Sequence, residues 1–273
     1  MENLVLNDVW GLEIAIEMTF LAIASFSIVL AYLSYLEGRI RDALIGGIVA
    51  TVLPILSLII LNLHLLKPEA AYLVFTSFQP RSWMPWGATG ITLLIVSSAL
   101  FTLLAKYGRQ GLIVNLVGVI ASLIGILVAL YTGLVLAYER GIPFWHSAIV
   151  PIISLLMGII GGASVYTIIR PSDTRITLTL GVTLLLLLVA YIAHIHLALI
   201  GPRAASYSAQ VALENPLFII GALLALIGGA IGLTTLKIKT QYIAVVLAAT
   251  GLIAILLLRV VLLTSGAWEL PII

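Results

Sequence analysis

Cysteine is absent from this 273-residue sequence, and charged residues are scarce, at 9% of the chain. Without cysteine the chain cannot form a disulfide, bind a metal or iron–sulfur cluster through thiolates, or use a cysteine nucleophile. Soluble domains carry about 25% charged residues, so this chain could not cover a water-exposed surface. The net charge of +2 is too small to indicate nucleic acid as a partner.

Apolar residues are abundant instead: they make up 62% of the chain, and the mean hydropathy is +1.25. This composition excludes disorder. Eight apolar runs reach the length of about 20 residues that a bilayer-spanning helix needs. They are 9–36, 43–66, 86–105, 111–138, 147–169, 176–200, 216–236 and 241–265. We therefore predict an all-α integral membrane protein with eight transmembrane helices.

The basic residues between the runs predict how the protein is oriented. The loops after runs one, three, five and seven contain Arg39, Arg41, Lys106, Arg109, Arg170, Arg175, Lys237 and Lys239. The loops after runs two, four and six contain Lys67, Arg81, Arg140 and Arg203. Cytoplasmic loops carry the excess of lysine and arginine. We therefore predict a multi-pass protein of the cytoplasmic membrane with both termini on the outer face.

The loops are too short to form a separate soluble catalytic domain. The longest, 67–85 and 201–215, lie on the predicted outer face. The protein therefore acts within the membrane or through partners that dock on it.

Ionisable side chains within the runs gather on one side of the membrane. With the predicted orientation, they and one phenol all fall in the outer half. These residues are Glu13, Glu17, His64, Tyr131, His194, His196 and Arg259. The pattern predicts a polar pocket that opens near the outer face, since such residues in membrane helices mark functional sites.

Glu13 and Glu17 are four residues apart, so both should lie on one face of their helix. Carboxylates are costly in lipid, and we expect both to face the interior of the bundle, where Glu17 can accept a proton. For Glu13 a water-reached position at the interface is the alternative. Arg259 could take part in proton transfer, or it could extend to the interface or pair with a buried glutamate.

Several short motifs resemble those of the NrfD/PsrC family, the membrane subunits of polysulfide reductase and related molybdopterin oxidoreductases. The family's Asp-Leu-Gly-Arg-Pro is similar to 64–68, its (Asn/His)-Pro-x-Ser to 79–82, and its Trp-Gly to 86–87. The family's Tyr-Thr-Gly and following Pro-(Leu)-Trp resemble 131–133 and 143–145. Arg259 with Gly266 is a third match. The order and spacing of the motifs extend the resemblance over essentially the whole chain.

The resemblance implies two four-helix bundles, 1–140 and 141–273, with a quinone site in the first. The implied quinone-binding residues are Glu17 and Tyr131, and we predict that Glu13 and His64, on the same side of the membrane, also bind the quinone. Polysulfide reductase itself has histidine at the Glu17 position, so a carboxylate here could accept a proton directly or favour another quinone. His64 replaces the family's aspartate.

We accordingly predict a quinone-binding anchor subunit of a respiratory, polysulfide-reductase-like complex. Menaquinone or a similar quinone would exchange electrons with a docked iron–sulfur subunit carrying ferredoxin-like 4Fe-4S clusters, and these with a molybdopterin catalytic subunit. Protons would pass through Glu17, Glu13, His64 and Arg259. The predicted docking residues are Lys67, Arg81, Trp83 and Trp86, although tryptophans there could also form an ordinary interfacial belt.

Two other functions compete with this prediction. Intramembrane carboxylates also suit an ion-coupled secondary transporter, but the two halves show no inverted repeat, and the polar residues avoid the midplane. A haem b anchor needs facing histidines, whereas His194 and His196 point to opposite sides of one helix, so only His64 with one of them could form a site. We therefore expect no haem or metal in this chain.

Overall fold

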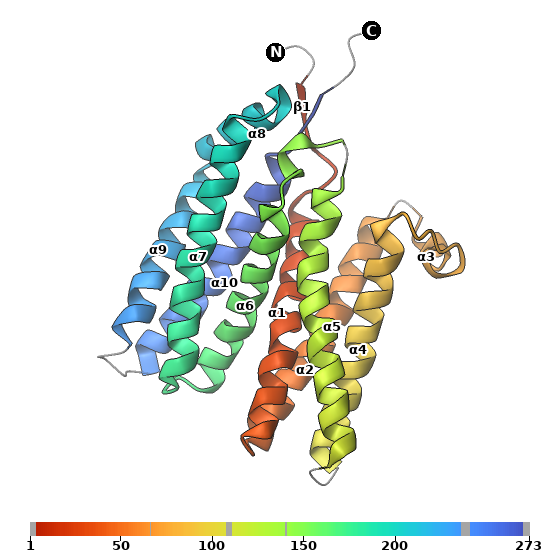
Figure 1. Cartoon of the computed structure of the whole chain (residues 1–273), viewed down its shortest axis with the longest axis vertical. Helices are drawn as coiled ribbons and strands as arrows, with labels where there is room; N and C mark the ends of the chain where they lie inside the picture. The colour runs from red at the N-terminus through yellow and green to blue at the C-terminus, as the bar shows by residue number, and fades with distance from the viewer. Residues whose placement is uncertain (1–3, 66, 108–110, 140, 236–240, 270–273) are drawn as a thin grey trace.

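The computed structural model describes residues 4–65, 67–107, 111–139, 141–235 and 241–269. Within these ranges, eight helices are long and apolar enough to cross a membrane (Figure 1). They are α1 (Leu12–Leu36), α2 (Ile40–His64), α4 (Trp83–Tyr107), α5 (Leu112–Ala137), α6 (Ile149–Ile169), α7 (Thr174–Leu199), α9 (Pro216–Thr234) and α10 (Gln241–Thr264). The predicted all-α membrane fold with eight spans is confirmed. Both ends of each predicted run lie within three residues of the ends of the corresponding helix.

Short polar turns explain where several helices begin and end. The Asp173 carboxylate accepts a hydrogen bond from the backbone N–H of Arg175 (3.1 Å) and so caps α7. Asn215 caps α9 in the same way, and Pro216 occupies the first helical position. Between α1 and α2, Gly38 has a φ of 74°, a left-handed conformation that favours glycine.

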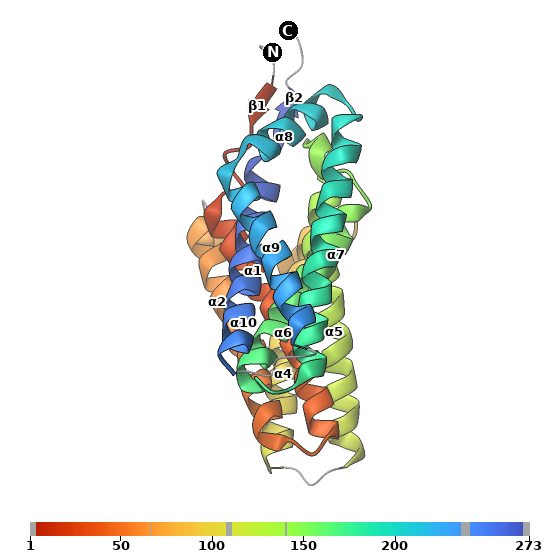
Figure 2. The same ribbon diagram turned by 90° about the vertical axis from the view of Figure 1, so that its left-hand side faces the viewer.

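Helix α1 runs through the middle of the molecule and contacts both halves of the chain. It packs against α2 and α5 on one side and against α6 and α10 on the other (Figures 1 and 2). One cluster of buried apolar residues is built from α1, α2, α4 and α5. The second is built mainly from α6, α7, α9 and α10, with the start of α1. The division into two bundles at residue 140 stays a prediction, and α1 contributes to both clusters.

Glycines let α6 approach α1 closely. A Cβ atom on Gly162 would lie 2.6 Å from the backbone carbon of Phe26, and one on Gly161 would lie 2.8 Å from the Cα atom of Ile23. Small residues at helix contacts are typical of membrane proteins, because they let backbones pack against one another. This contact fixes the position of α1 between the two clusters.

Both chain ends lie at the same end of the molecule, which we call the terminal end (Figure 1). There β1 (Leu4–Leu6) pairs antiparallel with β2 (Ala267–Glu269), with Val5 opposite Trp268. The short 3-10 helix η2 (Pro143–Trp145) packs against β2. The strand pair therefore ties the start of the chain to its last helix.

The two long loops contain helices that the sequence did not indicate. Residues 67–85 include η1 (Pro68–Ala70) and α3 (Leu73–Thr76), and 201–215 contain α8 (Arg203–Glu214), which crosses the terminal end (Figure 2). Helix α8 buries a face of alanines and Ser208, whose Oγ accepts a hydrogen bond from the backbone N–H of Ala267 (2.9 Å). Helix α8 thus caps the second cluster.

The orientation of the terminal end toward the outer side stays a prediction. Four of the basic residues on which it rests, Arg109, Arg140, Lys237 and Lys239, lie outside the described residues.

Arg170 joins the two halves at the end opposite the termini. It is 8% exposed, and it donates hydrogen bonds from Nε to the Asp42 carboxylate (2.7 Å) and from Nη1 to the Glu37 carboxylate (2.9 Å). Burial alone would lower the pKa of Arg170, but the two carboxylates outweigh burial and raise this pKa above its ordinary value. The guanidinium therefore stays charged and links the α6–α7 turn to the start of α2.

Replacing Arg170 with alanine is expected to lower the free energy of unfolding by about 2 kcal/mol, because two charge-assisted hydrogen bonds are lost. Thermal unfolding of the detergent-solubilised protein measures this effect. Arg175→Ala is the control: Arg175 lies in the same turn but is exposed, so its loss should change stability little. Equal unfolding temperatures for the two variants would contradict the role of Arg170.

Candidate functional site

Glu17 lies between one and two turns into α1 and is buried, with 5% of its surface exposed. The hydroxyl of Ser57, on α2, donates a hydrogen bond to Glu17 Oε1 (2.8 Å). Ser57 is itself fully buried and lies about two turns from the end of α2. The pair therefore places a carboxylate inside the protein at the level where α1 and α2 cross.

A buried guanidinium balances this carboxylate from α10. Arg259 is fully buried, and its Nη1 donates a hydrogen bond to Ser154 Oγ on α6 (3.0 Å). Arg259 interacts electrostatically with Glu17, although no direct ion pair joins them among the described residues. A buried charge is stable only with an opposite charge or hydrogen bonds nearby. Glu17 and Arg259 therefore account for each other's burial.

Tyr131, on α5, completes the group on the side of α4. Its ring lies directly against Gly87 of α4, where a Cβ atom would overlap the phenol. The phenol is partly buried and lies close enough to Glu17 to interact with it electrostatically. Four helices thus bring together a phenol, a carboxylate with its serine, and a guanidinium, each one to two turns from the terminal end of its helix. We call these four residues, together with Ser154 and Gly87 that contact them, the buried group.

Glu13 and His64, two of the predicted site residues, lie at the surface of the protein. Glu13 is exposed, so the expectation that both glutamates face the interior is wrong for Glu13. It lies in the first turn of α1, as in the interfacial alternative. His64 is the last residue of α2 and is exposed, and its Nε2 lies 3.2 Å from the carbonyl oxygen of Val9. The structure therefore places both outside the buried group.

The two histidines of α7 point in opposite directions, as their spacing predicts. His194 is buried at 1% exposure, with its ring 4.7 Å from the Phe144 ring, whereas His196 is exposed. Within the described residues, no cluster of three or more histidine, aspartate or glutamate side chains could hold a metal ion.

The predicted docking residues lie on the terminal end beside α3. Lys67, Arg81 and Trp86 are exposed, and Trp83 is half-buried. The Trp83 ring packs on Tyr138 (centroids 5.1 Å apart), and Trp86 packs on Phe78 (5.1 Å) while its Nε1 donates a hydrogen bond to the Pro80 carbonyl oxygen (3.1 Å). These contacts hold the segment in one conformation.

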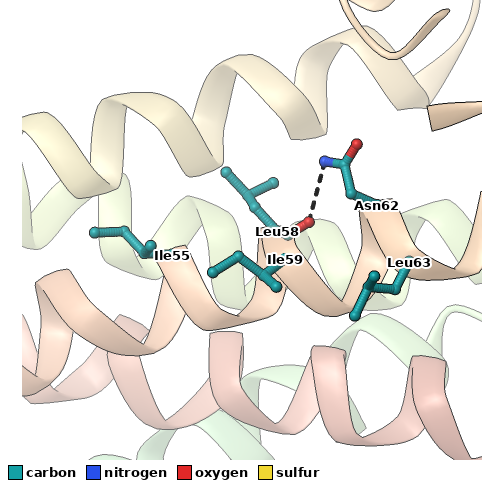
Figure 3. A pocket seen from close by; sticks show the side chains of 5 residues that line it. All are labelled: Ile55, Leu58, Ile59, Asn62 and Leu63. Atoms are coloured by element: carbon teal, nitrogen blue, oxygen red, sulfur yellow. Dashed lines mark hydrogen bonds between the residues drawn. The ribbon is translucent and has the colours of Figure 1, made fainter. Parts of the chain in front are cut away.

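A groove of about 340 Å³ lies on the outward face of α2 (Figure 3). Its lining is apolar except for Asn62, whose side-chain nitrogen donates a hydrogen bond to the Leu58 carbonyl oxygen (3.2 Å). The remaining lining residues are Ile55, Ile59 and Leu63. Helical spacing places Ser57 on the opposite face of α2. The groove is therefore separate from the buried group and offers no set of convergent polar atoms.

Three residues of the buried group were missed by the sequence analysis as site residues: Ser57, Ser154 and Gly87. Gly87 falls within a family-like motif, but no sequence signal showed that it makes room for Tyr131. The two serines lie in apolar helices and become informative only when their hydrogen-bond partners are known.

The arrangement can bind and deprotonate a polar head group at the edge of the membrane. A phenol can donate a hydrogen bond, a buried carboxylate can accept a proton, and a fixed guanidinium can stabilise the carboxylate charge.

A protein-family model described as NrfD, polysulphide reductase, matches residues 1–271 of the chain. The match includes every residue of the buried group. No curated protein matches the chain.

Proposed function

The chain belongs to the NrfD, polysulphide reductase, family, and from that premise we propose that it binds a membrane quinone and passes its electrons to a docked iron–sulfur subunit. Family membership makes the chain a membrane subunit of quinol-linked oxidoreductase complexes. The quinone, menaquinone or a similar molecule, and the assignment of its site to this chain are the proposal.

The observation that carries the proposal is the buried group formed by Glu17, Tyr131 and Arg259. A quinone head group is a flat apolar ring with an oxygen at each end, and the group fits this chemistry. The Tyr131 phenol would hold one ring oxygen, and the Glu17 carboxylate would hold the other. Ser57 supports this geometry, because its hydrogen bond fixes one carboxylate oxygen of Glu17.

In this proposal Glu17 accepts a proton from the quinol hydroxyl beside it. Oxidation of a bound quinol supplies two electrons and two protons, and the electrons leave through the cofactors of the partner subunit. Glu13 lies about one helical turn closer to the terminal end, about 6 Å along the axis, and is exposed. Glu13 and the neighbouring surface residue His64 would pass the proton from Glu17 to water.

The iron–sulfur subunit would dock on the terminal end, over Lys67, Arg81, Trp83 and Trp86. The exposed cations and the packed tryptophans offer charge and flat apolar surface, which suit a protein interface. A molybdopterin subunit would bind the iron–sulfur subunit in turn and reduce the terminal substrate. The chain is thus one subunit of an oxidoreductase and does not catalyse the whole reaction alone.

Co-purification with partner subunits, followed by a quinol-oxidation assay, tests the proposal. We expect the tagged chain to retain an iron–sulfur and a molybdopterin subunit, and the complex to oxidise a menaquinol analogue. Added quinone should quench the tryptophan fluorescence of the chain in a saturable manner. Ion uptake by liposomes containing the chain alone, without quinone binding, would instead support a transporter.

Replacing Gly87 with alanine is expected to slow quinol oxidation roughly tenfold while leaving the fold intact. The added methyl group overlaps the outer end of the Tyr131 ring, so the phenol must swing away from Glu17. Steady-state quinol oxidation measures the effect.

Gly90→Ala is the matched control for Gly87→Ala. Gly90 lies on the same helix, and its added Cβ atom would be 3.5 Å from Val128, an ordinary contact. Wild-type rates in both variants would show that the position of Tyr131 is unimportant.

A further inference from the structure

Helices α7 and α10 bury nitrogen atoms that have no hydrogen-bond partner among the residues that the structure describes. Both ring nitrogens of His194 and two nitrogens of Arg259, Nε and Nη2, are in this state. A neutral imidazole always carries one N–H donor, and a guanidinium carries five. Unpaired buried donors are costly, and proteins commonly satisfy them with buried water.

Tyr191 lies near both of these side chains. It precedes His194 by three residues, so both face the same side of α7, and their ring centroids are 6.4 Å apart. The Tyr191 hydroxyl donates a hydrogen bond to the carbonyl oxygen of Leu258 (2.6 Å), the residue before Arg259, and interacts electrostatically with the Arg259 guanidinium. Both side chains with unpaired nitrogens, His194 and Arg259, are therefore near one phenol.

Polar groups continue from this point along α10 toward the terminal end. Trp145 Nε1 donates a hydrogen bond to the Leu262 carbonyl oxygen (2.7 Å), and the Ser265 hydroxyl, buried one turn further, has no partner. Asn7 follows, with its side-chain nitrogen 3.1 Å from the Leu263 carbonyl oxygen. These polar groups together extend from the level of Glu17 to the pair of strands β1 and β2.

We propose that Arg259, Tyr191 and His194 hold a short single-file chain of buried water molecules, which we call the file, and that it carries protons between Glu17 and the terminal end. The inference rests on the proposed function. It gives the second proton of each quinol a route through the second cluster, distinct from the surface route past Glu13. Each transfer moves one proton from one water molecule to the next, while the two electrons leave through the iron–sulfur subunit, so no residue is consumed.

Substitution of His194 with phenylalanine tests the file, with His196→Phe as the matched control. Phenylalanine fills the volume against Phe144 but removes both nitrogen atoms, whereas His196 is exposed on the opposite side of the same helix. In the intact complex, His194→Phe should lower quinol oxidation roughly tenfold and raise the rate ratio between water and deuterium oxide. Quinone binding and the unfolding temperature should stay at wild-type values. His194→Gln, which keeps hydrogen-bonding atoms, should recover most of the rate.

A wild-type rate and isotope effect in His194→Phe would overturn the file, as would equally slow Phe and Gln variants with a lowered unfolding temperature. Failure of the proposed function has a different signature: the wild-type complex itself would neither bind quinone nor oxidise quinol, which would overturn both inferences.

Discussion

The complex with Glu17 replaced by glutamine is expected to oxidise quinol at least about 100-fold more slowly than the wild type, because a general base contributes at least about that factor to the rate. Glutamine has almost the same shape and can still accept the hydrogen bond from Ser57 through its amide oxygen. It cannot accept a proton from the quinol. Arg259 loses its balancing charge, so the unfolding temperature should fall. The loss in turnover should therefore be measured on complex that keeps its partner subunits. Steady-state oxidation of a menaquinol analogue by the purified complex measures it.

Glu214→Gln provides the control for this substitution. Glu214 lies at the end of α8, is exposed, and belongs to the same end of the molecule, so the same chemical change should leave the rate at its wild-type value. Glu17→Asp keeps the carboxylate and should retain an intermediate rate. Wild-type turnover in Glu17→Gln, with partner subunits still bound, would contradict the assignment of this carboxylate as the proton acceptor.

The spans could be predicted from the sequence because bilayer thickness and apolar length fix them together. Helix α8 and the strand pair could not. Helix α8 has only 12 residues, too few to cross a bilayer, and its buried face consists of small residues, alanines and one serine, although they are spaced as on one face of a helix. Strand β1 has only three residues. Both are held by contacts with distant parts of the chain, such as the bond between Ala267 and Ser208.

Parts of the candidate site could be predicted for a related reason. Ionisable residues are so rare in the spans that Glu17 and Arg259 stand out, and burial of both agrees with the prediction that such groups avoid lipid. The prediction for Glu13 was wrong because its four-residue spacing from Glu17 gives the face of the helix but not the degree of burial at each turn. The role of Glu17 and Arg259 in quinone chemistry stays a proposal.

The serines illustrate the limit of sequence reasoning. Ser25, Ser27 and Ser34 of α1 each donate a hydrogen bond to the carbonyl oxygen four residues earlier, which is the usual arrangement in an apolar helix. Ser57 in α2 instead donates to Glu17, forty residues away in the sequence. The residue type and its apolar surroundings are the same in both cases, so only the packing of α1 against α2 distinguishes them.

The second large effect is expected for Tyr131→Phe, which should weaken quinone binding and slow quinol oxidation by roughly tenfold to 100-fold. The loss of one hydrogen bond in a buried site costs about 1–3 kcal/mol, and about 1.4 kcal/mol corresponds to a factor of ten. Phenylalanine keeps the ring against Gly87, so packing should be preserved while the donor to the quinone oxygen is lost. Fluorescence titration with quinone and steady-state turnover measure the two effects.

Tyr242→Phe controls for the chemical change, since Tyr242 is 87% exposed at the other end of the molecule. The double variant of Gly87→Ala with Tyr131→Phe gives the sharper test. If Gly87 acts by positioning the Tyr131 hydroxyl, then alanine has no hydroxyl to displace in the phenylalanine background and should add little further loss. Fully additive effects of the two substitutions would show that Gly87 acts independently of the phenol, because residues that work through one contact are not additive.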